Sequence, residues 1–476
     1  MSIKFQYWFQ KCTLSFAFII LRYNFSFAQE KLTLNAKEVI SILKNYHPVI
    51  RQTNIAIEQS KADILQARAA FDPVLRTYLT QKTFNGENYY QYVTPEIHIP
   101  TWYGIEVNAG FENLRGNRTL NPDTKGQTNY LGFSVPLAKN LVIDKRRAYL
   151  QQAKLFNQMT ITEQQVIVND ILFDAMQTYW NWVRAYQTYL IVKSNVEVNE
   201  KRLDFVRKSY KNGERPAIDS VEALSQLMSF QLEQNKQYLD FQQAGNELNN
   251  FLWNENQVMY QLPESVVPQE NWDNEQAIQQ FDLSLGTLLA SAQINHPELR
   301  LYHTKLSVLA IDKKLKFQEL LPKLDFEYNF LGKGYNSYET ISKSAIFQNN
   351  YQYGLKFEMP LRLSQGRASY QLAKLKIENT ELDFVQKRQK IELKVKYYFN
   401  EMSMLKKQIE IQQANYANYQ RLVKAEMTRF DNGESSLFLI NSRETKALEA
   451  LEKLIEIKMK YFKSIYALQW SAGLLR

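Results

Sequence analysis

Residues 148–154 read AYLQQAK, and residues 368–374 read ASYQLAK. The two stretches lie 220 residues apart (368 − 148), and KNGE at 211–214 recurs as DNGE at 431–434 with the same offset. A unit of that length is far longer than the roughly 20–50 residues of a solenoid repeat. The chain is therefore predicted to contain one large structural unit twice.

The spacing between the copies also shows where they differ. Pro73 recurs as Pro322 at an offset of 249, whereas Pro136 recurs as Pro360 at an offset of 224. The first copy therefore has 25 additional residues (249 − 224) between its two prolines. Because this surplus is confined to one internal segment, the rest of each unit is expected to fold alike.

Residues 1–28 are predicted to be a secretory signal peptide. Lysines precede an apolar run at 14–21, and the small-x-small sequence Ser26-Phe27-Ala28 follows it as a cleavage site. The run is too short to cross a bilayer, which takes about 20 apolar residues. Cys12 is the only cysteine and precedes the cleavage site, so the exported chain is predicted to lack disulfides and thiolate metal sites.

Charge and motifs exclude several classes of function. Without residues 1–28 the formal net charge falls from +9 to +6, because Lys4, Lys11 and Arg22 are removed. The remaining basic residues alternate with acidic ones along the predicted helices, which indicates solvated helix faces and no nucleic-acid partner. No GxSxG, Walker A or HExxH sequence occurs. We therefore expect neither an enzyme nor a protein with a cofactor.

His47 and His296 each precede a proline, Pro48 or Pro297, at equivalent positions of the two copies. Proline fits the first turn of a helix and disfavours continuation of the preceding one. Each His-Pro pair is therefore interpreted as the junction between a short helix and a longer one, and not as part of a metal site.

Two very long helices are predicted. Neither Gly nor Pro occurs from Asn140 to Lys211 or from Arg367 to Asp431, stretches of 72 and 65 residues. At about 1.5 Å per residue, helices of this length reach roughly 100 Å. Between Val168 and Leu190 apolar residues recur every three or four positions, the spacing of a coiled-coil seam.

Each long helix is predicted to end at an Asn-Gly pair and to reverse there. The pairs are Asn212-Gly213 and Asn432-Gly433, and glycine readily adopts the positive φ that ends a helix. A second helix follows each pair, over about 217–253 and 434–472. The chain is therefore expected to form two tall antiparallel helical hairpins.

Segments between the helices alternate between apolar and polar residues and are predicted to be strands. The clearest are 131–137, 324–330 and 351–359, and a further pair at 90–99 and 105–111 lies in the surplus of the first copy. Aromatic residues on one face, and lengths near the roughly 9–11 residues that cross a bilayer, are typical of a membrane β-barrel. A soluble hairpin packed on a helix would alternate in the same way; the predicted export and the abundance of aromatic residues favour the barrel.

The order of these features resembles that of TolC-type outer-membrane efflux proteins over nearly all of the exported chain. The resemblance rests on the two Gly-bearing tips and on LTLNAKEVISILKNYHPVIRQ at 32–52, ILQARAAFDPVL at 64–75 and GFSVPLAKNLVIDKRRAYLQQAK at 132–154. It implies a mainly α fold with a membrane β-barrel part, in which duplicated long-helix hairpins and β-hairpins from three chains form one α/β tunnel.

Association is also expected on physical grounds, because four strands cannot close a barrel and an open edge is not tolerated in lipid. A barrel of 12 strands in the trimer is expected, with the additional hairpin projecting outward. The alternative is 18 strands, if both additional strands of each chain join the barrel.

The predicted organisation has four parts. They are the signal peptide at 1–28, a first repeat at 29–262, a linker at 263–280 and a second repeat at 281–476. Within the repeats, strands are expected at about 74–137 and 323–360, and helical hairpins at about 140–253 and 367–472.

The resemblance implies a channel in the outer membrane, with a periplasmic extension, that serves as the exit duct of a tripartite efflux or type I secretion system. The implied partners are two further copies of the chain, a periplasmic adaptor (membrane fusion protein), an inner-membrane transporter and outer-membrane lipid. The alternative is a periplasmic coiled-coil scaffold or adaptor-like binding protein. An adaptor usually carries one helical hairpin, whereas the duplication predicts two, which favours the channel.

The helix tips are the first candidate site. The turns around Asn212, Gly213, Asn432 and Gly433 are the only predicted helix reversals away from the strands. Family members use the matching tips to contact the adaptor, so the resemblance implies the same role here. The glycines would serve equally well as helix caps alone.

A periplasmic gate is the second candidate site. Asp219 and Glu222 follow Gly213 by six and nine residues, and a trimer would present each acid three times, as a ring. The gating aspartates usual in the family match Leu439 and Ser442 here, which moves any acidic ring to the first repeat. The alternative is that Asp219 only stabilises the positive end of its helix dipole.

Overall fold

The computed structural model describes residues 32–116, 126–273, 284–334 and 349–475. The predicted signal peptide, residues 1–28, and residues 274–280 of the predicted linker lie outside these described residues. The chain divides into two compact units, each built from three separate stretches. The first unit contains Met1–Ile42, Thr178–Gln280 and Ile411–Met459, and the second contains Leu43–Gln177, Phe281–Glu410 and Lys460–Arg476.

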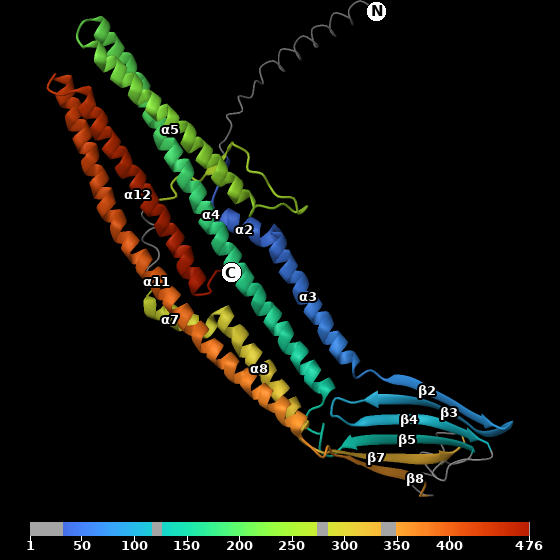
Figure 1. The fold of residues 1–476 in the computed structure, drawn as a ribbon. Helices are drawn as coiled ribbons and strands as arrows, with labels where there is room; N and C mark the ends of the chain where they lie inside the picture. The colour runs from blue at the N-terminus through green and yellow to red at the C-terminus, as the bar shows by residue number, and fades with distance from the viewer. Residues whose placement is uncertain (1–31, 117–125, 274–283, 335–348, 476) are drawn as a thin grey trace, which may run out of the picture. The chain divides into compact units, whose positions relative to one another are not determined.

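The helices of the two halves of the chain correspond in order and length (Figure 1). Helices of 11 residues, α2 (Ala36–Tyr46) and α7 (Leu285–Asn295), lead into helices of 22 residues, α3 (Pro48–Ala69) and α8 (Pro297–Gln318). The long helices α4 (Lys145–Lys211) and α11 (Ser364–Asp431) have 67 and 68 residues, and the chain returns through α5 (Ala217–Asn249) and α12 (Leu437–Ser471). The predicted long helices are confirmed, with ends shifted by a few residues. None of the helices in the described residues is both long and apolar enough to cross a bilayer.

His47 and His296 directly precede α3 and α8. The Nδ1 atom of each accepts a hydrogen bond from the backbone N–H two residues further on, at 3.2 Å for both Val49 and Glu298. Burial lowers the pKa of the His296 imidazole, which favours the neutral form that can accept this bond. The predicted His-Pro helix junctions are therefore confirmed, and each histidine caps a helix.

Six strands of the second unit form one antiparallel sheet in the order β2-β3-β4-β5-β7-β8. Their bounds are Val74–Phe84 for β2, Glu87–Pro100 for β3, Glu106–Arg115 for β4, Gly126–Pro136 for β5, Lys323–Lys333 for β7 and Tyr351–Glu358 for β8. The sheet is a single layer in Figure 1 and follows directly on the ends of α3 and α8.

The additional hairpin of the first copy, β3 and β4, lies inside this sheet between β2 and β5. Ala109 of β4 pairs with Ile97 on one side and with Leu131 of β5 on the other. The expectation that this hairpin projects outward is therefore wrong, and so is the basis for preferring 12 strands, because three sheets of this size hold 18 (3 × 6). Alternation shows which residues share a face, but not which strands are neighbours.

The two faces of the sheet differ in chemistry. On one face aliphatic and aromatic side chains form rows across four strands, such as Ala109, Leu131, Phe330, Tyr351 and, next to it, Val107, Phe133, Tyr328, Tyr353. The other face carries polar rows, such as Asn108, Gly132, Asn329, Gln352. The register thus separates the two classes of side chain as the alternation predicts.

An aromatic cluster attaches the linker and α5 to α4 in the first unit. The short strand β1 (Leu32–Leu34) pairs in parallel with β6 (Val266–Pro268) of the linker. The Tyr179 hydroxyl donates to the carbonyl of Leu34 at 3.2 Å. Trp182 is fully buried and stacks on Phe241 of α5, with ring centroids 6.1 Å apart. Large aromatic rings therefore supply much of the contact between these elements.

The position of β4 beside β5 can be tested with an engineered disulfide. With Cys12 replaced by serine, Ala109→Cys and Leu131→Cys place two thiols at directly paired positions, where Cβ atoms lie about 4.5–5.5 Å apart. We expect a disulfide on mild oxidation, seen as altered migration on non-reducing gels. Tyr328→Cys with Tyr353→Cys is the matched pair on β7 and β8. A crosslink in the matched pair alone would contradict this strand order.

Candidate functional site

Both long helices end in the same backbone turn. Gly213 and Gly433 have φ angles of +78° and +80°, in the left-handed region that favours glycine. The N–H of Glu214 donates to the Ser209 carbonyl at 3.0 Å, and that of Glu434 to the Arg429 carbonyl at 2.8 Å. These are the long bonds of a Schellman motif, so the predicted reversals at the two Asn-Gly pairs are present.

A hydrophobic core, here called the tip core, lies behind these turns and joins the two helical hairpins within the first unit. Its buried members are Val196, Leu203, Val206, Ala223, Leu227, Phe230, Phe430, Leu437 and Ile440. They come from α4, α5, α11 and α12, and the ends of the two hairpins lie side by side in Figure 1. Because all four helices contribute, the tips are packed against one another.

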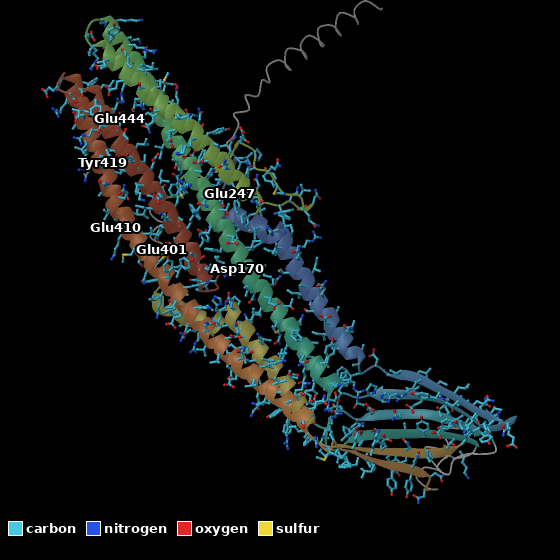
Figure 2. All side chains as sticks on the ribbon, viewed as in Figure 1. Asp170, Glu247, Glu401, Glu410, Tyr419 and Glu444 are labelled. Atoms are coloured by element: carbon cyan, nitrogen blue, oxygen red, sulfur yellow. The ribbon has the colours of Figure 1, made fainter. Side chains whose placement is uncertain are left out.

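A charged network crosses the tip core. The guanidinium of Arg202 makes a bidentate ion pair with the carboxylate of Glu444, which Figure 2 labels on α12 near the hairpin end. The two side chains are only 11% and 12% exposed. Arg202 also donates to the side-chain oxygen of Asn441 at 3.4 Å, and the amide of Asn441 donates to Glu222 at 3.2 Å. Removing either charge would leave the other buried without its partner, which is strongly destabilising.

Asp219, the other predicted gate residue, takes part in a different contact. Its carboxylate lies 3.6 Å from the guanidinium of Arg215. That guanidinium in turn lies 3.7 Å from the centre of the Phe430 ring, a cation–π contact between the first tip and α11. Asp219 and Glu222 are thus each connected to the second hairpin, one through Arg215 and the other through Asn441.

The second tip contains a buried acid that the first tip lacks. Glu426 is 6% exposed, accepts a hydrogen bond from the Ser435 hydroxyl at 2.6 Å, and lies 3.7 Å from both Arg429 and Arg443. Val206 occupies the equivalent position of the first copy (426 − 220) and belongs to the tip core. The two tips therefore share a backbone turn but differ in the chemistry behind it.

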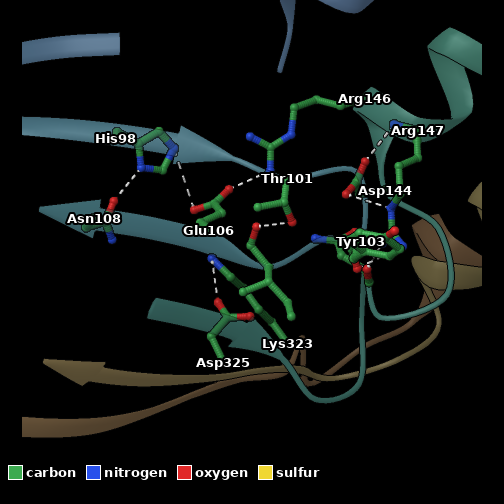
Figure 3. A network of polar contacts seen from close by, with 12 residues as sticks. His98, Thr101, Tyr103, Glu106, Asn108, Asp144, Arg146, Arg147, Lys323 and Asp325 are labelled. Atoms are coloured by element: carbon green, nitrogen blue, oxygen red, sulfur yellow. Dashed lines mark hydrogen bonds and ion pairs between the residues drawn. The ribbon is translucent and has the colours of Figure 1, made fainter. Parts of the chain in front are cut away.

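The polar face of the sheet carries a separate network at its helical end (Figure 3). Glu106 accepts a hydrogen bond from Arg146 and lies 3.8 Å from His98, whose Nδ1 is 2.6 Å from the side-chain oxygen of Asn108. Two further pairs complete it, Arg147 with Asp144 at 3.1 Å and Lys323 with Asp325 at 3.5 Å. Within the described ranges no group of three or more His, Cys, Asp or Glu side chains could hold a metal ion.

The sequence interpretation missed Arg202, Asn441 and Glu444 as members of the tip network. A signal existed, because Arg202 lies next to Leu203 and Glu444 lies four residues after Ile440, both buried in the tip core. A charged residue within a heptad seam indicates a buried partner. The partner itself lies 242 residues away (444 − 202), too far for any local pattern to identify it.

A family model described as outer membrane efflux protein matches residues 288–473, which hold α8, β7, β8, α11 and α12. The match spans 186 of the 476 residues (473 − 288 + 1), so it concerns the second copy of the repeated unit. Over this stretch the chain is similar to the outer membrane efflux proteins, as the sequence resemblance predicts. No curated protein gives a significant match.

Solved structures share the fold over most of their length. The chain is similar to CusC at 14% identity and a TM-score of 0.65, with 92% of each chain covered. It is similar to the Campylobacter jejuni CmeC outer membrane channel at 16% and 0.63, with 92% of this chain and 85% of that chain covered. For the Vibrio cholerae outer membrane protein VceC the values are 13% and 0.63, with 92% and 96% covered. At such identities the likeness concerns the fold.

The buried pair in the tip core can be measured with a double-mutant cycle of Arg202→Ala and Glu444→Ala. We expect a coupling free energy of about 1.5–3 kcal/mol in urea unfolding of the detergent-solubilised protein, because both charged groups are largely shielded from water. Asp204 and Lys208 form an exposed pair on α4 and serve as the control, with an expected coupling of about 0.3–0.5 kcal/mol. Equal coupling in the two cycles would show that Arg202 and Glu444 contribute no more than a surface pair.

Proposed function

We propose that three copies of this chain form one exit duct of the outer membrane, which works with a periplasmic adaptor and an inner-membrane transporter. The observation that supports this proposal is the combination of an apolar sheet face with exposed edge strands. Every residue of β2 is exposed, as are all but one in β8. Unpaired edge groups are not tolerated in hydrocarbon, and pairing β8 of one copy with β2 of the next would satisfy them.

The size of the sheet supports association as well. Within the described residues one chain supplies six strands to this sheet, whereas closed barrels of the outer membrane have about eight or more. Three chains would supply 18 strands (3 × 6). The long helices α4 and α11 follow β5 and β8 after short connections. If the sheets of three chains closed into a ring, the helices attached to them would form a ring as well.

A periplasmic scaffold or adaptor-like protein remains the competing function, and fractionation with conductance separates the two. For the duct we expect recovery in the outer membrane, a trimeric mass in detergent, heat-modifiable migration on gels and steady conductance in planar bilayers. Recovery as a soluble periplasmic protein without conductance would contradict the duct and support the scaffold.

The turns around Asn212, Gly213, Asn432 and Gly433 are the proposed contact site of the adaptor. These turns are exposed and lie at the free ends of both hairpins. They are held in a fixed shape by the Schellman bonds and by the tip core behind them. A rigid, exposed pair of turns of similar backbone is a surface that a partner could bind with little loss of conformational entropy.

Valine in place of both tip glycines, Gly213→Val and Gly433→Val, tests this contact. Space around each glycine is open, so the effect is limited to the turn, where a β-branched residue is strained at positive φ. We expect an intact trimer but loss of efflux, measured as accumulation of a transported dye. Gly286→Val in α7, also in open space but at an ordinary φ, is the control. Full efflux from an intact tip variant would exclude the tips as the contact site.

Asp219 and Glu222 are proposed as an acidic ring of the closed periplasmic end. We expect the double variant Asp219→Ala, Glu222→Ala to show larger single-channel conductance and weaker block by divalent cations, because two sets of three carboxylates are lost. Asp204→Ala, which removes an exposed acid from α4, is the control. Unchanged conductance and block would exclude the ring and leave Asp219 its ion pair with Arg215 and a helix-dipole contribution of about 0.3–1 kcal/mol.

A further inference from the structure

A basic pocket of about 330 Å³ lies in the second unit, between the helical end of the sheet and the helices. It is formed by the loop after β5, the end of α8 and the segment that joins β8 to α11. Its lining residues are Lys139, Asn140, Lys145, Leu315, Lys316, Gln318, Glu319, Pro360, Arg362, Leu363, Gln365 and Gly366.

The wall of this pocket is rigidly built. The backbone N–H of Asn140 donates to the side-chain oxygen of Gln318 at 3.0 Å, which fixes the loop against α8. Gly366 lies in the first turn of α11, and a Cβ there would lie 2.9 Å from the backbone oxygen of Glu319. The absence of a side chain therefore allows α11 to begin directly against the end of α8.

The pocket has a clear excess of positive charge. Four of its lining residues are cationic, and Glu319 is the one carboxylate among the lining residues that the structure describes. Glu319 is paired with Lys316 at 3.1 Å. The ammonium groups of Lys139 and Lys145 and the guanidinium of Arg362 have no side-chain partner among the described residues. Three unpaired cations around one cavity are suited to an anion.

Apolar side chains beside the pocket point to the kind of anion. Leu361, between Pro360 and Arg362 of the pocket wall, is fully exposed. Val142, in the loop between Asn140 and Lys145, is 75% exposed. An aliphatic surface next to unpaired cations fits a ligand that carries both a negative group and hydrocarbon.

The register places the pocket at one end of the apolar face. The pair Pro100–Glu106 closes the turn between β3 and β4, and the pair Lys323–Glu358 lies at the same end of the sheet. The pocket residues follow β5 and β8 at this end, so the turn and the pocket lie at the same end of the sheet. That turn exposes Trp102 and, at 82%, Tyr103. Tryptophan and tyrosine are enriched where a membrane meets water. This end of the sheet therefore has the composition of a membrane boundary.

We propose that this pocket binds the headgroup of an anionic phospholipid at the periplasmic boundary of the outer membrane. Lys139, Lys145 and Arg362 would contact the phosphate, and the acyl chains would lie along Val142 and Leu361. The proposal rests on the proposed function, in which the sheet lies in the membrane and the helices extend into the periplasm.

Lipid binding by the purified, full-length protein in neutral detergent tests the proposal. Bound phosphatidylglycerol would be counted by native mass spectrometry for the natural protein and for the variant Lys139→Gln, Lys145→Gln, Arg362→Gln. We expect phosphatidylglycerol to bind more tightly than phosphatidylcholine, and the triple variant to bind it on the order of 100-fold more weakly, from about 1 kcal/mol for each basic residue near an anionic lipid surface. Lys376→Gln, Lys406→Gln, Lys407→Gln removes the same charge from exposed positions of α11 away from the pocket and should bind as the natural protein does.

Three results would overturn the proposal. They are equal binding by the triple variant and the natural protein, equal binding of phosphatidylglycerol and phosphatidylcholine, and displacement of the lipid by millimolar inorganic phosphate, which would identify a site for free phosphate. Conductance and outer-membrane fractionation of the triple variant keep the two proposals apart. Normal conductance with lost lipid binding supports the lipid site, whereas absence of conductance in the natural protein contradicts the duct and not the pocket.

Discussion

Backbone hydrogen bonding at the edges of the sheet is the constraint on which the rest of the molecule depends. The outer strands β2 and β8 each have a neighbour on one side only, and the face between them is aliphatic and aromatic. Such a face is stable in hydrocarbon, where each unpaired N–H or C=O group costs several kcal/mol. The apolar face therefore suits the sheet to lipid, whereas its unpaired edges would make a single sheet unstable there. Further copies of the chain offer the matching edges, because β2 and β8 are both exposed and lie at the two opposite edges of the sheet.

Much of this fold could be predicted, because its helices and strand faces follow from local rules. Long stretches without Gly or Pro became α4 and α11, and the alternation from Leu324 to Phe330 gave the apolar face of β7. The position of the additional hairpin could not be predicted in this way. Period-two alternation is the same for a strand inside a sheet and for one in a projecting hairpin, and only the pairing of Ala109 with both Ile97 and Leu131 decides between them. The partners in the tip network could not be identified for a related reason, since Arg202 and Glu444 lie on different hairpins, 242 residues apart (444 − 202).

The contrast within the first unit suggests why the tips are built as they are. Around Trp182, α4 and α5 meet through large buried rings, with Trp182 stacked on Phe241, and such rings pack densely and are costly to separate. Behind the turns α4, α5, α11 and α12 meet through mainly aliphatic groups, with two phenylalanines among them, interrupted by Arg202, Asn441 and Glu444. A buried ion pair contributes little net stability relative to apolar packing of similar volume, but it specifies one arrangement of its partners. The tips are thus held in a defined position by polar groups that could bind water instead if the hairpins separated. The apolar rings of the aromatic cluster gain no comparable interaction with water.

The polar face of the sheet is also suited to conduction. In the proposed duct this face lines the lumen, and several of its carboxylates are paired with a cation. Glu96 lies 2.8 Å from Arg76 and accepts a hydrogen bond from the Tyr130 hydroxyl at 2.5 Å, while Glu106 is paired with Arg146. Charges paired at short range produce only a weak field further away, especially in salt. A wall of this kind would neither bind a charged cargo tightly nor exclude it, which is what passive transit requires, and selection would then have to occur at the tips or in the partners that the tips contact.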